Sequence, residues 1–459
     1  MATLLSAGRA TWARWGLVAA LAILLAMDYA QVWSITNNHD FAVFYQAAER
    51  LRDGQDIYQD IDTFKHAIES GSFVLKDPNT VWPYAYPPLA AVVLLPLTAL
   101  PYPLAAAAWT AVNLLFLWAG CALVVLGTGR VTWVMVAAVL LLLIRFYPAT
   151  VALRLGQLEV SQFLLIALAL WALAGRRERL AGISLGVATA LKFFPGALLG
   201  FLLWKRRWRP AAWGIAVAMG LLAASYAVVG LDSLPRYLAF TSVYSHGGFA
   251  AFPYNQSLSG FFTRAFTANL FVTPVRGINS PSLAWGLTAL ATTAVTLPFL
   301  AVTWGPGDPT SERFSLEYAL AVVVLLLASP HSQIYAFVWL LLPFIVLVRW
   351  VARQGHVPWL VVGGLLIAYL LIGQDFAFNV RFVIRFIQAH LMVGTLVLWG
   401  LLIVVLWNRK EFVATQPGPP NPPILGGTRF TPPRIGGLGG LPTTAETILA
   451  AWLSSNKSF

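Results

Sequence analysis

The stretch that decides how this chain is organised opens with NNHDFAVFYQAAERLRDGQDIY, residues 37–58, and closes with YAYPPL, residues 84–89. Hydrophobic sequence lies on both sides of it. Eight of the chain's 18 acidic residues fall inside it: Asp40, Glu49, Asp53, Asp56, Asp60, Asp62, Glu69 and Asp77. Since an acidic loop of this length follows a first hydrophobic span directly, we expect the chemistry of the protein to take place in it.

The start of this loop predicts a short amphipathic helix. Phe41, Phe44, Tyr45, Ala48 and Leu51 recur at helical spacing, and charged residues fall on the other side. Such a helix is suited to the membrane interface, and Gly54 is a natural C-terminal stop. Asp40 precedes the helix, where an aspartate commonly serves as N-cap. Capping and catalysis are both open for Asp40, and one residue can do both.

The composition places the chain among polytopic membrane proteins. Of 459 residues, 59% are hydrophobic and 10% are charged, and 19 Trp and 14 Tyr suit interfacial belts. One cysteine, Cys121, excludes a disulfide framework within the chain. We expect an all-α, polytopic membrane protein with about 11–13 membrane helices, including short or re-entrant ones.

Hydrophobic runs give the expected spans. They cover residues 12–33, 103–127, 131–148, 158–175, 180–191, 194–204, 210–230, 283–304, 315–329, 333–350, 358–373 and 388–407. Alternate short loops carry the arginines and lysines, so the net charge of +12 reflects topology and not nucleic-acid binding. We expect an inner or plasma membrane location, with both termini cytoplasmic and the Asp40 loop extracytoplasmic.

Two hydrophobic segments do not read as simple spans. Residues 87–101, interrupted by prolines, are too short to cross and predict a re-entrant or interfacial segment. Residues 180–191 and 194–204 are separated by a break at Lys192 and Pro195. An ionisable residue within the membrane is a functional candidate, although Lys192 could instead snorkel to the interface.

The C-terminal region differs in composition from the rest. We expect a membrane-embedded domain over residues 1–410, with residues 36–102 as its catalytic outer loop. From residue 411 the chain is rich in Pro and Gly and predicts a largely disordered cytoplasmic tail, with a possible short helix at residues 444–453. The sequence has no nucleotide-binding P-loop, no HExxH and no Cys/His cluster, so we expect neither a metal nor a cofactor.

The ordered motifs resemble a known family. Asp40 is followed by Phe41-x-x-Phe44-Tyr45-x-Ala47-Ala48, then by Tyr86-Pro87-Pro88-Leu89 and Pro96-Leu97-x-x-Leu100-Pro101. Further matches are Gly156-Gln157, the break at Leu191-Lys192-x-x-Pro195, and Asn255-Gln256-Ser257. Over residues 15–405 this set is similar to glycosyltransferase family 87, the GT-C-fold mannosyltransferases that depend on polyprenol-phosphate-mannose. In one departure, Tyr335 stands where family members often have a histidine, which leaves the sugar and the acceptor open.

The resemblance implies transfer of a hexose, expected to be mannose, from a polyprenyl-phosphate donor to an acceptor hydroxyl on a glycolipid or glycan, with inversion. Such a transfer needs one general base and cations for the leaving phosphate. The expected roles are a catalytic base, Asp40; donor-phosphate ligands, Lys192, Arg264 and Arg154, with Arg381 and Arg385 behind them; and substrate contacts, Tyr86, Gln157, Glu159, Asn255, Gln256, His331 and Tyr335.

Two other classes remain as alternatives. A lipid or sugar transporter or flippase would also use broken helices and charges within the membrane. The sequence shows no internal repeat, and its acids lie in an outer loop, both of which disfavour a transporter. An oligosaccharide polymerase or ligase is the other alternative, although the long loop here is early in the chain and not late.

Overall fold

The structure, a computed structural model, describes residues 2–34, 38–70, 72, 82–246, 248–269, 271, 277–375 and 388–408. All of them belong to one compact unit, Met1–Lys410. The expected tail from residue 411 and its short helix at 444–453 lie outside the described residues.

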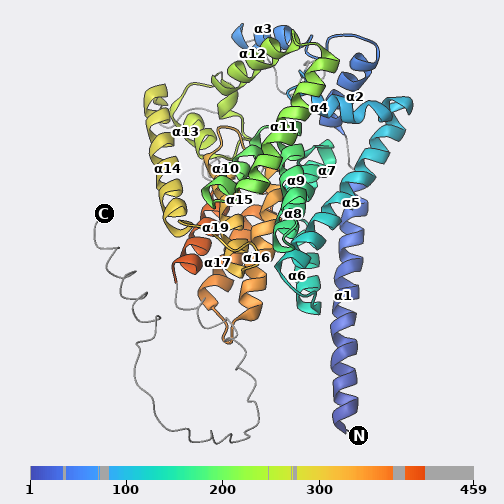
Figure 1. The fold of residues 1–459 in the computed structure, drawn as a ribbon, viewed down its shortest axis with the longest axis vertical. Helices are drawn as coiled ribbons and strands as arrows, with labels where there is room; N and C mark the ends of the chain where they lie inside the picture. The colour runs from blue at the N-terminus through green and yellow to red at the C-terminus, as the bar shows by residue number, and fades with distance from the viewer. Residues whose placement is uncertain are drawn as a thin grey trace, which may run out of the picture. The chain divides into compact units, whose positions relative to one another are not determined.

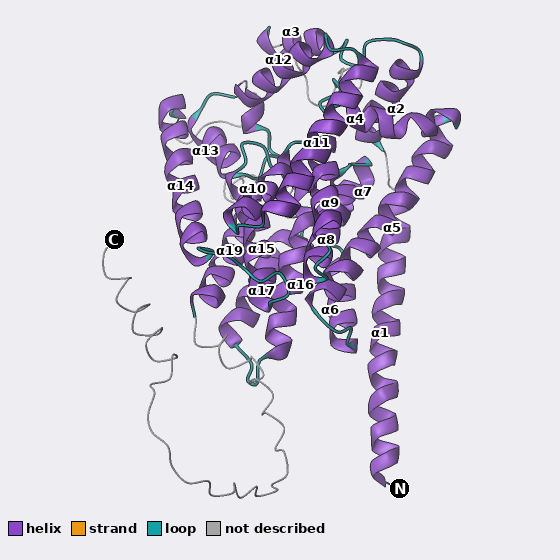
Figure 2. Cartoon of the chain, in the orientation of Figure 1, coloured by secondary structure: helices purple, strands orange, loops and turns teal. Residues whose placement is uncertain are grey.

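All regular elements in these ranges are helices (Figure 2). The first part of the chain contains α1 (Ala2–Ser34), α2 (His39–Arg52), α3 (Ile61–Glu69), α4 (Pro88–Leu94), η1 (Leu95–Ala99), α5 (Tyr102–Thr128), α6 (Trp133–Leu143) and α7 (Tyr147–Leu155). The middle contains α8 (Glu159–Ala174), α9 (Glu178–Leu191), η2 (Phe194–Gly196), α10 (Ala197–Trp204), α11 (Trp208–Val229), α12 (Ser233–His246), η3 (Gly248–Ala251) and α13 (Leu258–Phe266). The last part contains α14 (Pro281–Val302), α15 (Glu312–Ala328), η5 (Ile334–Leu340), α16 (Leu341–Arg353), α17 (Trp359–Gly373) and α19 (His390–Trp407).

Six of these helical segments are long and apolar enough to cross a membrane. They are Trp12–Trp33, Tyr102–Thr128, Trp208–Val229, Pro281–Val302, Ile334–Arg353 and His390–Trp407. The pair α6 and α7, bent by 61° at its break, would add a seventh, and four shorter apolar segments of 10–17 residues accompany them. The prediction of an all-α, multi-pass membrane protein is confirmed.

The irregular segments also fold as the sequence indicates. Residues 88–99 form a short apolar helical segment, α4 with η1, which begins directly after Pro87. Helix α9 ends at Leu191, and Lys192 has an extended backbone with φ −160° and ψ 126°. The nine-residue helix α7 was not anticipated, because the run 131–148 reads as one span but bends at Arg145, whose φ is 53°.

Helix α2 packs its apolar face against the rest of the protein. Its apolar residues Phe41, Phe44, Tyr45, Ala47 and Ala48 are buried. The helix packs against α4, η1 and α7 at one end of the bundle (Figure 1). Helices α3 and α12 pack together at this same end, which we call the α2 end. The α2 end is therefore a layer of short helices that covers the ends of the long ones.

The turns that carry most of the described arginines gather at the opposite end, which we call the basic end. Side-chain contacts connect these turns to one another and to α1: Arg353 with the Thr128 carbonyl (2.8 Å), Arg176 with Asp308 (3.9 Å), Lys205 with the Thr303 carbonyl (2.9 Å), and Arg14 over the Trp133 ring (5.4 Å). The alternate turns that carry Arg and Lys in the sequence thus lie together at one end of the structure, the basic end.

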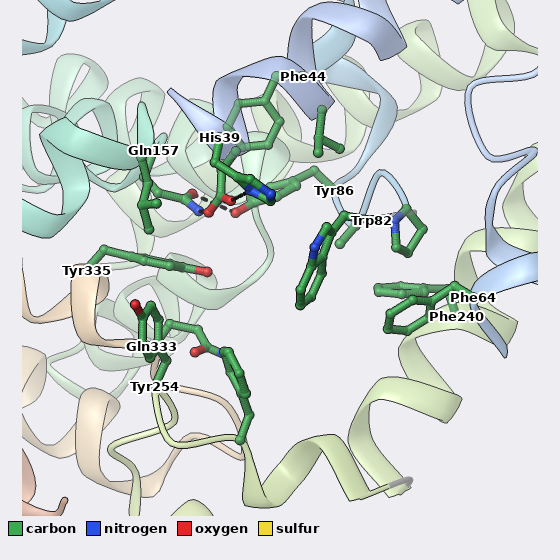
Figure 3. Close-up of a pocket in the computed structure, with 16 residues that line it drawn as sticks. His39, Phe44, Phe64, Trp82, Tyr86, Gln157, Phe240, Tyr254, Gln333 and Tyr335 are labelled. Carbon is green, nitrogen blue, oxygen red and sulfur yellow. Dashed lines mark hydrogen bonds and ion pairs between the residues drawn. The ribbon is translucent and has the colours of Figure 1, made fainter. Parts of the chain in front are cut away.

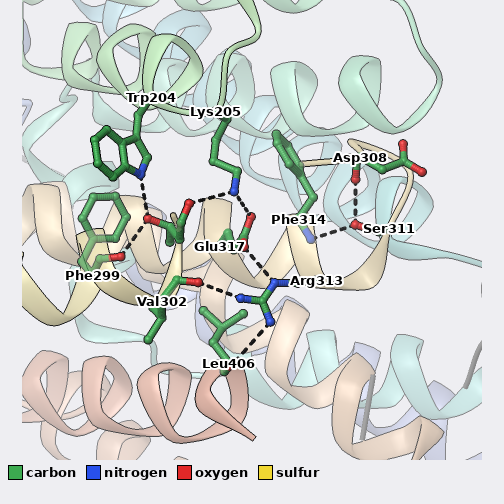
Figure 4. Close-up of polar contacts among 11 residues, drawn as sticks. Trp204, Lys205, Phe299, Val302, Asp308, Ser311, Arg313, Phe314, Glu317 and Leu406 are labelled. Carbon is green, nitrogen blue, oxygen red and sulfur yellow. Dashed lines mark hydrogen bonds and ion pairs between the residues drawn. The ribbon is translucent and has the colours of Figure 1, made fainter. Parts of the chain in front are cut away.

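A buried ionic network holds four helices together at the basic end (Figure 4). Lys205, which follows α10, and Glu317 of α15 are both buried, and their side chains lie 2.8 Å apart. The Arg313 guanidinium donates to Glu317 (3.0 Å), to the Val302 carbonyl of α14 (2.7 Å) and to the Leu406 carbonyl of α19 (3.2 Å). Every charge in this network has an opposite partner, which low-dielectric surroundings require.

The α2 end depends on a close contact between the start of α2 and the end of α7. Gly156 ends α7 in the left-handed conformation, with φ 71°. A Cβ atom at Gly156 would lie 2.6 Å from the Phe41 Cβ and 2.9 Å from the Asn38 Oδ1. The Asn38 N–H also donates to the Arg154 carbonyl at 2.9 Å. Glycine at position 156 therefore allows α2 to sit directly on α7.

We predict that Glu317→Gln destabilises the protein by about 3–5 kcal/mol, because it leaves the buried Lys205 ammonium without a counter-charge. Thermal or denaturant unfolding of the purified protein in detergent measures the change. Glu312→Gln on the same helix is the matched control. Glu312 pairs with Arg353 at 2.9 Å in a partly exposed position, so the Glu312→Gln substitution should lower stability by at most about 1 kcal/mol. Equal costs for the two variants would contradict a special role for the buried network.

We predict that Gly156→Ala costs more stability than Gly54→Ala. Both glycines have a left-handed backbone, at φ 71° and 68°, so both variants pay about 1–2 kcal/mol of backbone strain. Around Gly54 the structure leaves open space, whereas at Gly156 the new Cβ also meets Phe41 and Asn38, which adds about 1–3 kcal/mol. A comparison of the two unfolding midpoints tests this, and similar midpoints would refute the close contact.

Candidate active site

A cavity of about 360 Å³ opens at the α2 end beside Asp40 (Figure 3). Its walls come from the start of α2, from α3, from residues 82–86 before α4 and from the end of α7. The loop after η3, the start of η5 and helix α12 complete them. The lining residues are His39, Asp40, Val43, Phe44, Phe64, Trp82, Pro83, Ala85, Tyr86, Leu155, Gln157, Phe240, Phe252, Tyr254, Gln333 and Tyr335. Its volume suits a small ligand, and its walls combine aromatic rings with a few polar groups.

Asp40 faces this cavity and does not cap a helix. The N-cap of α2 is Asn38, and no side chain caps the first turn by a hydrogen bond. Asp40 lies within that turn, and its carboxylate accepts a hydrogen bond from the Gln157 amide instead. The capping alternative for Asp40 is therefore wrong. The negative charge lies near the N-terminus of α2, where the helix dipole favours it.

Gln157 and Tyr86 connect Asp40 to the protein interior. The Gln157 Nε2 donates to the Asp40 Oδ2, and the Gln157 Oε1 accepts from the Tyr86 hydroxyl at 2.8 Å. Gln157 and Tyr86 are both buried. Because Gln157 directly follows Gly156, the close contact of α2 with α7 also sets the position of this amide.

His39 is the solvent-facing neighbour of Asp40. Its Nδ1 lies 3.0 Å from the Asp40 Oδ1, and about half of its side chain is exposed (51%, against 28% for Asp40). The hydrogen bond to Asp40 raises the pKa of the His39 imidazole above its usual value, although partial burial opposes the shift. The two oxygens of Asp40 thus have different surroundings: one faces a buried amide and the other faces a half-exposed imidazole.

Lys192 and Glu159 lie directly behind the cavity wall as an ion pair. Glu159 is fully buried, and the Lys192 ammonium lies 4.9 Å from the centre of the Tyr86 ring and 5.6 Å from that of Tyr335. Tyr86 and Tyr335 both line the cavity. The structure therefore brings Lys192 beside the site, but with its charge already balanced by a carboxylate.

Arg154 lines a second cavity, of about 420 Å³, and both Arg154 and Asp40 act electrostatically on the Tyr254 hydroxyl of the first cavity. This cavity is lined by Asp28, Gln31 and Val32 of α1, by Arg145, Tyr147, Thr150 and Arg154, and by Gly373, Gln374 and Asp375. Arg145 faces Asp28 across 3.9 Å. In contrast, the Arg154 guanidinium makes no ion pair with any described residue, and its buried Nε has no hydrogen-bond partner among them.

Three further candidates support the loop that carries Tyr254. Asn255, Gln256 and Arg264 are buried. The Arg264 guanidinium donates to the Phe252 carbonyl (3.0 Å) and the Asn255 carbonyl (2.5 Å). Burial lowers the pKa of Arg264 to about 10, so the group remains charged at neutral pH.

The amides of Asn255 and Gln256 also bond main-chain carbonyls, and an isolated antiparallel bridge joins Asn255 to Gln333. These three residues hold the loop in place without lining the cavity. His331 belongs to the neighbouring loop, where its main-chain N–H donates to the Ser329 hydroxyl (3.3 Å), and it does not line the cavity either. The candidates Arg381 and Arg385 lie outside the described residues.

Most of the aromatic lining was not identified from the sequence. Trp82, Phe64, Phe240 and Tyr254 come from four separate segments, and Trp82 lies edge-on to the His39 ring at 6.2 Å. Figure 3 shows Trp82 between the Tyr335–Tyr254 side and the Phe64–Phe240 side. The available signal was the WPYAYPPL stretch at residues 82–89, in which only Tyr86 was singled out.

The arrangement combines a carboxylate with aromatic surfaces and nearby cations. A carboxylate within reach of a cavity can accept a proton from a bound hydroxyl. Within the described ranges, no three His, Cys, Asp or Glu side chains form a possible metal-binding set. The roles of the site residues and the expectation of no cofactor remain predictions.

Comparison with known proteins identifies the family. Residues 84–330 match the model of glycosyltransferase family 87. The chain is 30% identical over 314 residues to the polyprenol-phosphate-mannose-dependent alpha-(1-2)-phosphatidylinositol pentamannoside mannosyltransferase of Mycobacterium tuberculosis. This alignment covers 63% of this chain and 67% of that protein. It is 25% identical over 337 residues to the polyprenol-phosphate-mannose-dependent alpha-(1-2)-phosphatidylinositol mannoside mannosyltransferase of Mycolicibacterium smegmatis. This alignment covers 70% of this chain and 71% of that protein.

The family match spans more than half of the chain, and it contains α7, the Lys192 break and the loop that carries Tyr254. The resemblance drawn from the ordered motifs is confirmed: this multi-pass membrane protein is a glycosyltransferase and belongs to glycosyltransferase family 87.

Proposed function

We propose that this enzyme transfers a hexosyl group, mannose, from a polyprenyl-phosphate donor to a hydroxyl group of a glycolipid acceptor, with inversion at the sugar carbon. The names of both relatives describe dependence on polyprenol-phosphate-mannose and action on phosphatidylinositol mannosides, which supports the donor and the acceptor class. The observation that carries the proposal is the Asp40 carboxylate, which opens into an aromatic-lined cavity and takes no part in capping.

The segregation of charge supports an extracytoplasmic site. Arginine-rich turns gather at the basic end, and cytoplasmic loops carry the excess of Lys and Arg in membrane proteins. Arg14 near the start of α1 contacts Trp133 at this same end, so we place the N-terminus in the cytoplasm. The cavity at the α2 end then faces the outside of the membrane.

In the proposed reaction Asp40 is the general base. The acceptor O–H bond breaks as its proton moves to the carboxylate, while the acceptor oxygen bonds to the sugar carbon. The bond from that carbon to the phosphate oxygen breaks at the same time, through an oxocarbenium-like state. The polyprenyl phosphate leaves as an anion and needs no proton. Asp40 lies outside the stretch matched to the family model, so its role rests on its geometry.

For the leaving phosphate, Arg154 is the best placed of the described cations. Glu159 already balances the charge of Lys192, and Arg264 donates its Nη1 to main-chain carbonyls and lines neither cavity. Arg154 has no ionic partner among the described residues and lines a cavity with α1 as one wall. We propose that the lipid carrier enters beside α1 and places its phosphate against Arg154, with Lys192 as a secondary contact. Charge-assisted hydrogen bonds from a guanidinium would stabilise the phosphate as negative charge develops.

We predict that Asp40→Asn abolishes transfer while the protein still folds. The Asn side chain keeps an oxygen that can accept from Gln157, but it cannot take up a proton, which should lower kcat by about 10²–10⁴-fold. Transfer of radiolabelled mannose from polyprenyl-phosphate mannose to a phosphatidylinositol mannoside, with purified enzyme in lipid nanodiscs, measures the effect.

The matched control for this variant is Asp53→Asn at the other end of α2. Asp53 pairs with Arg52 (2.8 Å) and does not line the cavity, so transfer should remain close to that of the unmodified enzyme. An Asp40→Asn enzyme that retains normal turnover would remove the base assignment.

We predict that Arg154→Gln raises the KM for the donor by about 10–100-fold and leaves the KM for the acceptor unchanged. The loss of a hydrogen bond to a charged group, worth about 1.5–3 kcal/mol, accounts for this factor. Arg236→Gln at the same end is the control, since Arg236 pairs with Asp56 and lines neither cavity. If acceptor and donor KM rise together, or if Arg236→Gln has the same effect, Arg154 does not select the donor.

A further inference from the structure

The hydrogen bonds around Asp40 form a chain in which every donor points toward the carboxylate (Figure 3). The Tyr86 hydroxyl donates to the Gln157 Oε1, and the Gln157 Nε2 donates to the Asp40 Oδ2. An ionised carboxylate is an acceptor and has no proton to donate, so it selects this orientation of the amide. With a carboxylate as the final acceptor, the Tyr86 hydroxyl and the Gln157 amide N–H each have a hydrogen-bond acceptor.

The far end of the chain is held by packing and charge. The Tyr86 ring meets the Phe44 ring edge to face, with centroids 4.8 Å apart. The Lys192 ammonium lies 4.9 Å from the centre of the Tyr86 ring and is anchored by the buried Glu159. A cation over the ring is attracted to its face and polarises the phenol, so that the hydroxyl becomes a stronger donor.

We propose that Gln157 and Tyr86 are positioning residues that hold Asp40 and turn its second oxygen, Oδ1, toward the acceptor hydroxyl. This inference rests on the proposed function of Asp40 as general base. Gln157 occupies Oδ2, while Oδ1 faces the half-exposed His39, which an incoming acceptor can displace. The acceptor proton moves to Oδ1, and neither Gln157 nor Tyr86 gains or loses a proton in the step. Gln157, expected to contact substrate, acts here through Asp40.

The other ionisable groups near Asp40 are independent of this chain. His39 adjoins it on α2, and the charge of Asp40 also acts on the Tyr254 hydroxyl from the facing loop. Arg154 and Asp375 act electrostatically on that same hydroxyl. Substitutions at Gln157 and Tyr86 leave all four groups in place. A change in the kcat of such variants therefore reports the loss of donors to Asp40.

The first test compares Tyr86→Phe with Tyr84→Phe in the nanodisc assay. Both tyrosines are buried in the same aromatic cluster. The Tyr84 hydroxyl bonds the Pro87 carbonyl (2.8 Å) and the Ala91 N–H (3.0 Å) but not Gln157, and Tyr84 does not line the cavity. Tyr86→Phe should lower kcat by about 10-fold with both KM values unchanged, while Tyr84→Phe should alter stability but not kcat per folded enzyme.

The second test uses Gln157→Met, which keeps the length of the side chain but cannot donate. We expect a fall in kcat of about 10²-fold, comparable to the cost of a misplaced catalytic group. Both KM values should remain close to those of the unmodified enzyme, because the amide orients the carboxylate and does not itself bind substrate. The double variant Tyr86→Phe/Gln157→Met should be no slower than Gln157→Met, since Tyr86 acts only through that amide.

Three outcomes would overturn the inference. They are equal kcat values for Tyr86→Phe and Tyr84→Phe, an unchanged kcat in Gln157→Met, and multiplied losses in the double variant. Asp40→Asn distinguishes this failure from failure of the proposed function. If Asp40→Asn is inactive while the Gln157 and Tyr86 variants behave normally, Asp40 remains the base and the positioning chain is refuted. If Asp40→Asn is active, the function itself is refuted.

Discussion

The contact between the first turn of α2 and the last turn of α7 is the constraint on which the site depends. It requires a residue without a side chain at position 156, because a Cβ there would meet Phe41 and Asn38. The same contact places Gln157, the next residue, against Asp40. One backbone approach therefore determines where the carboxylate lies and which of its oxygens is occupied. The proposed chemistry is a consequence of how closely two short helices can pack.

The low dielectric of a membrane protein explains how the charges at the two ends differ. At the basic end, Lys205 and Arg313 share the Glu317 carboxylate in a network that joins four helices, so these charges serve stability. At the α2 end, Lys192 forms an ion pair with Glu159. Arg154 lacks such a partner among the residues that the structure describes, although its Nε is buried. A cation left in this state costs free energy unless an anion joins it. A lipid phosphate would supply that anion.

Much of the fold follows from the sequence because bilayer thickness and loop charge act on contiguous residues. The spans, the short segment after Pro87 and the break at Lys192 were all visible in this way. Asp40 is proposed as the base because it is the first carboxylate after the opening span. Its partner Gln157 lies 117 positions further along the chain, and no local pattern could pair the two residues. Helix α7 was missed for a related reason: its nine residues continue an apolar run, and the bend at Arg145 is set by packing. The capping interpretation of Asp40 failed because the N-cap of α2 is Asn38, two residues earlier.

A general base at a membrane surface faces two opposing demands. It has to remain ionised, which water favours, and it has to lie in a cavity that excludes water once the acceptor is bound. Hydrogen-bond donors fixed within the protein meet both demands, because they replace hydration without having to reorganise during the reaction. Gln157 can serve in this way because its amide is buried and its carbonyl is already bonded to Tyr86. A lysine or arginine in its place would bind the carboxylate more strongly and make it a weaker base. A neutral donor held by a second neutral donor favours the charged form while the carboxylate can still accept a proton.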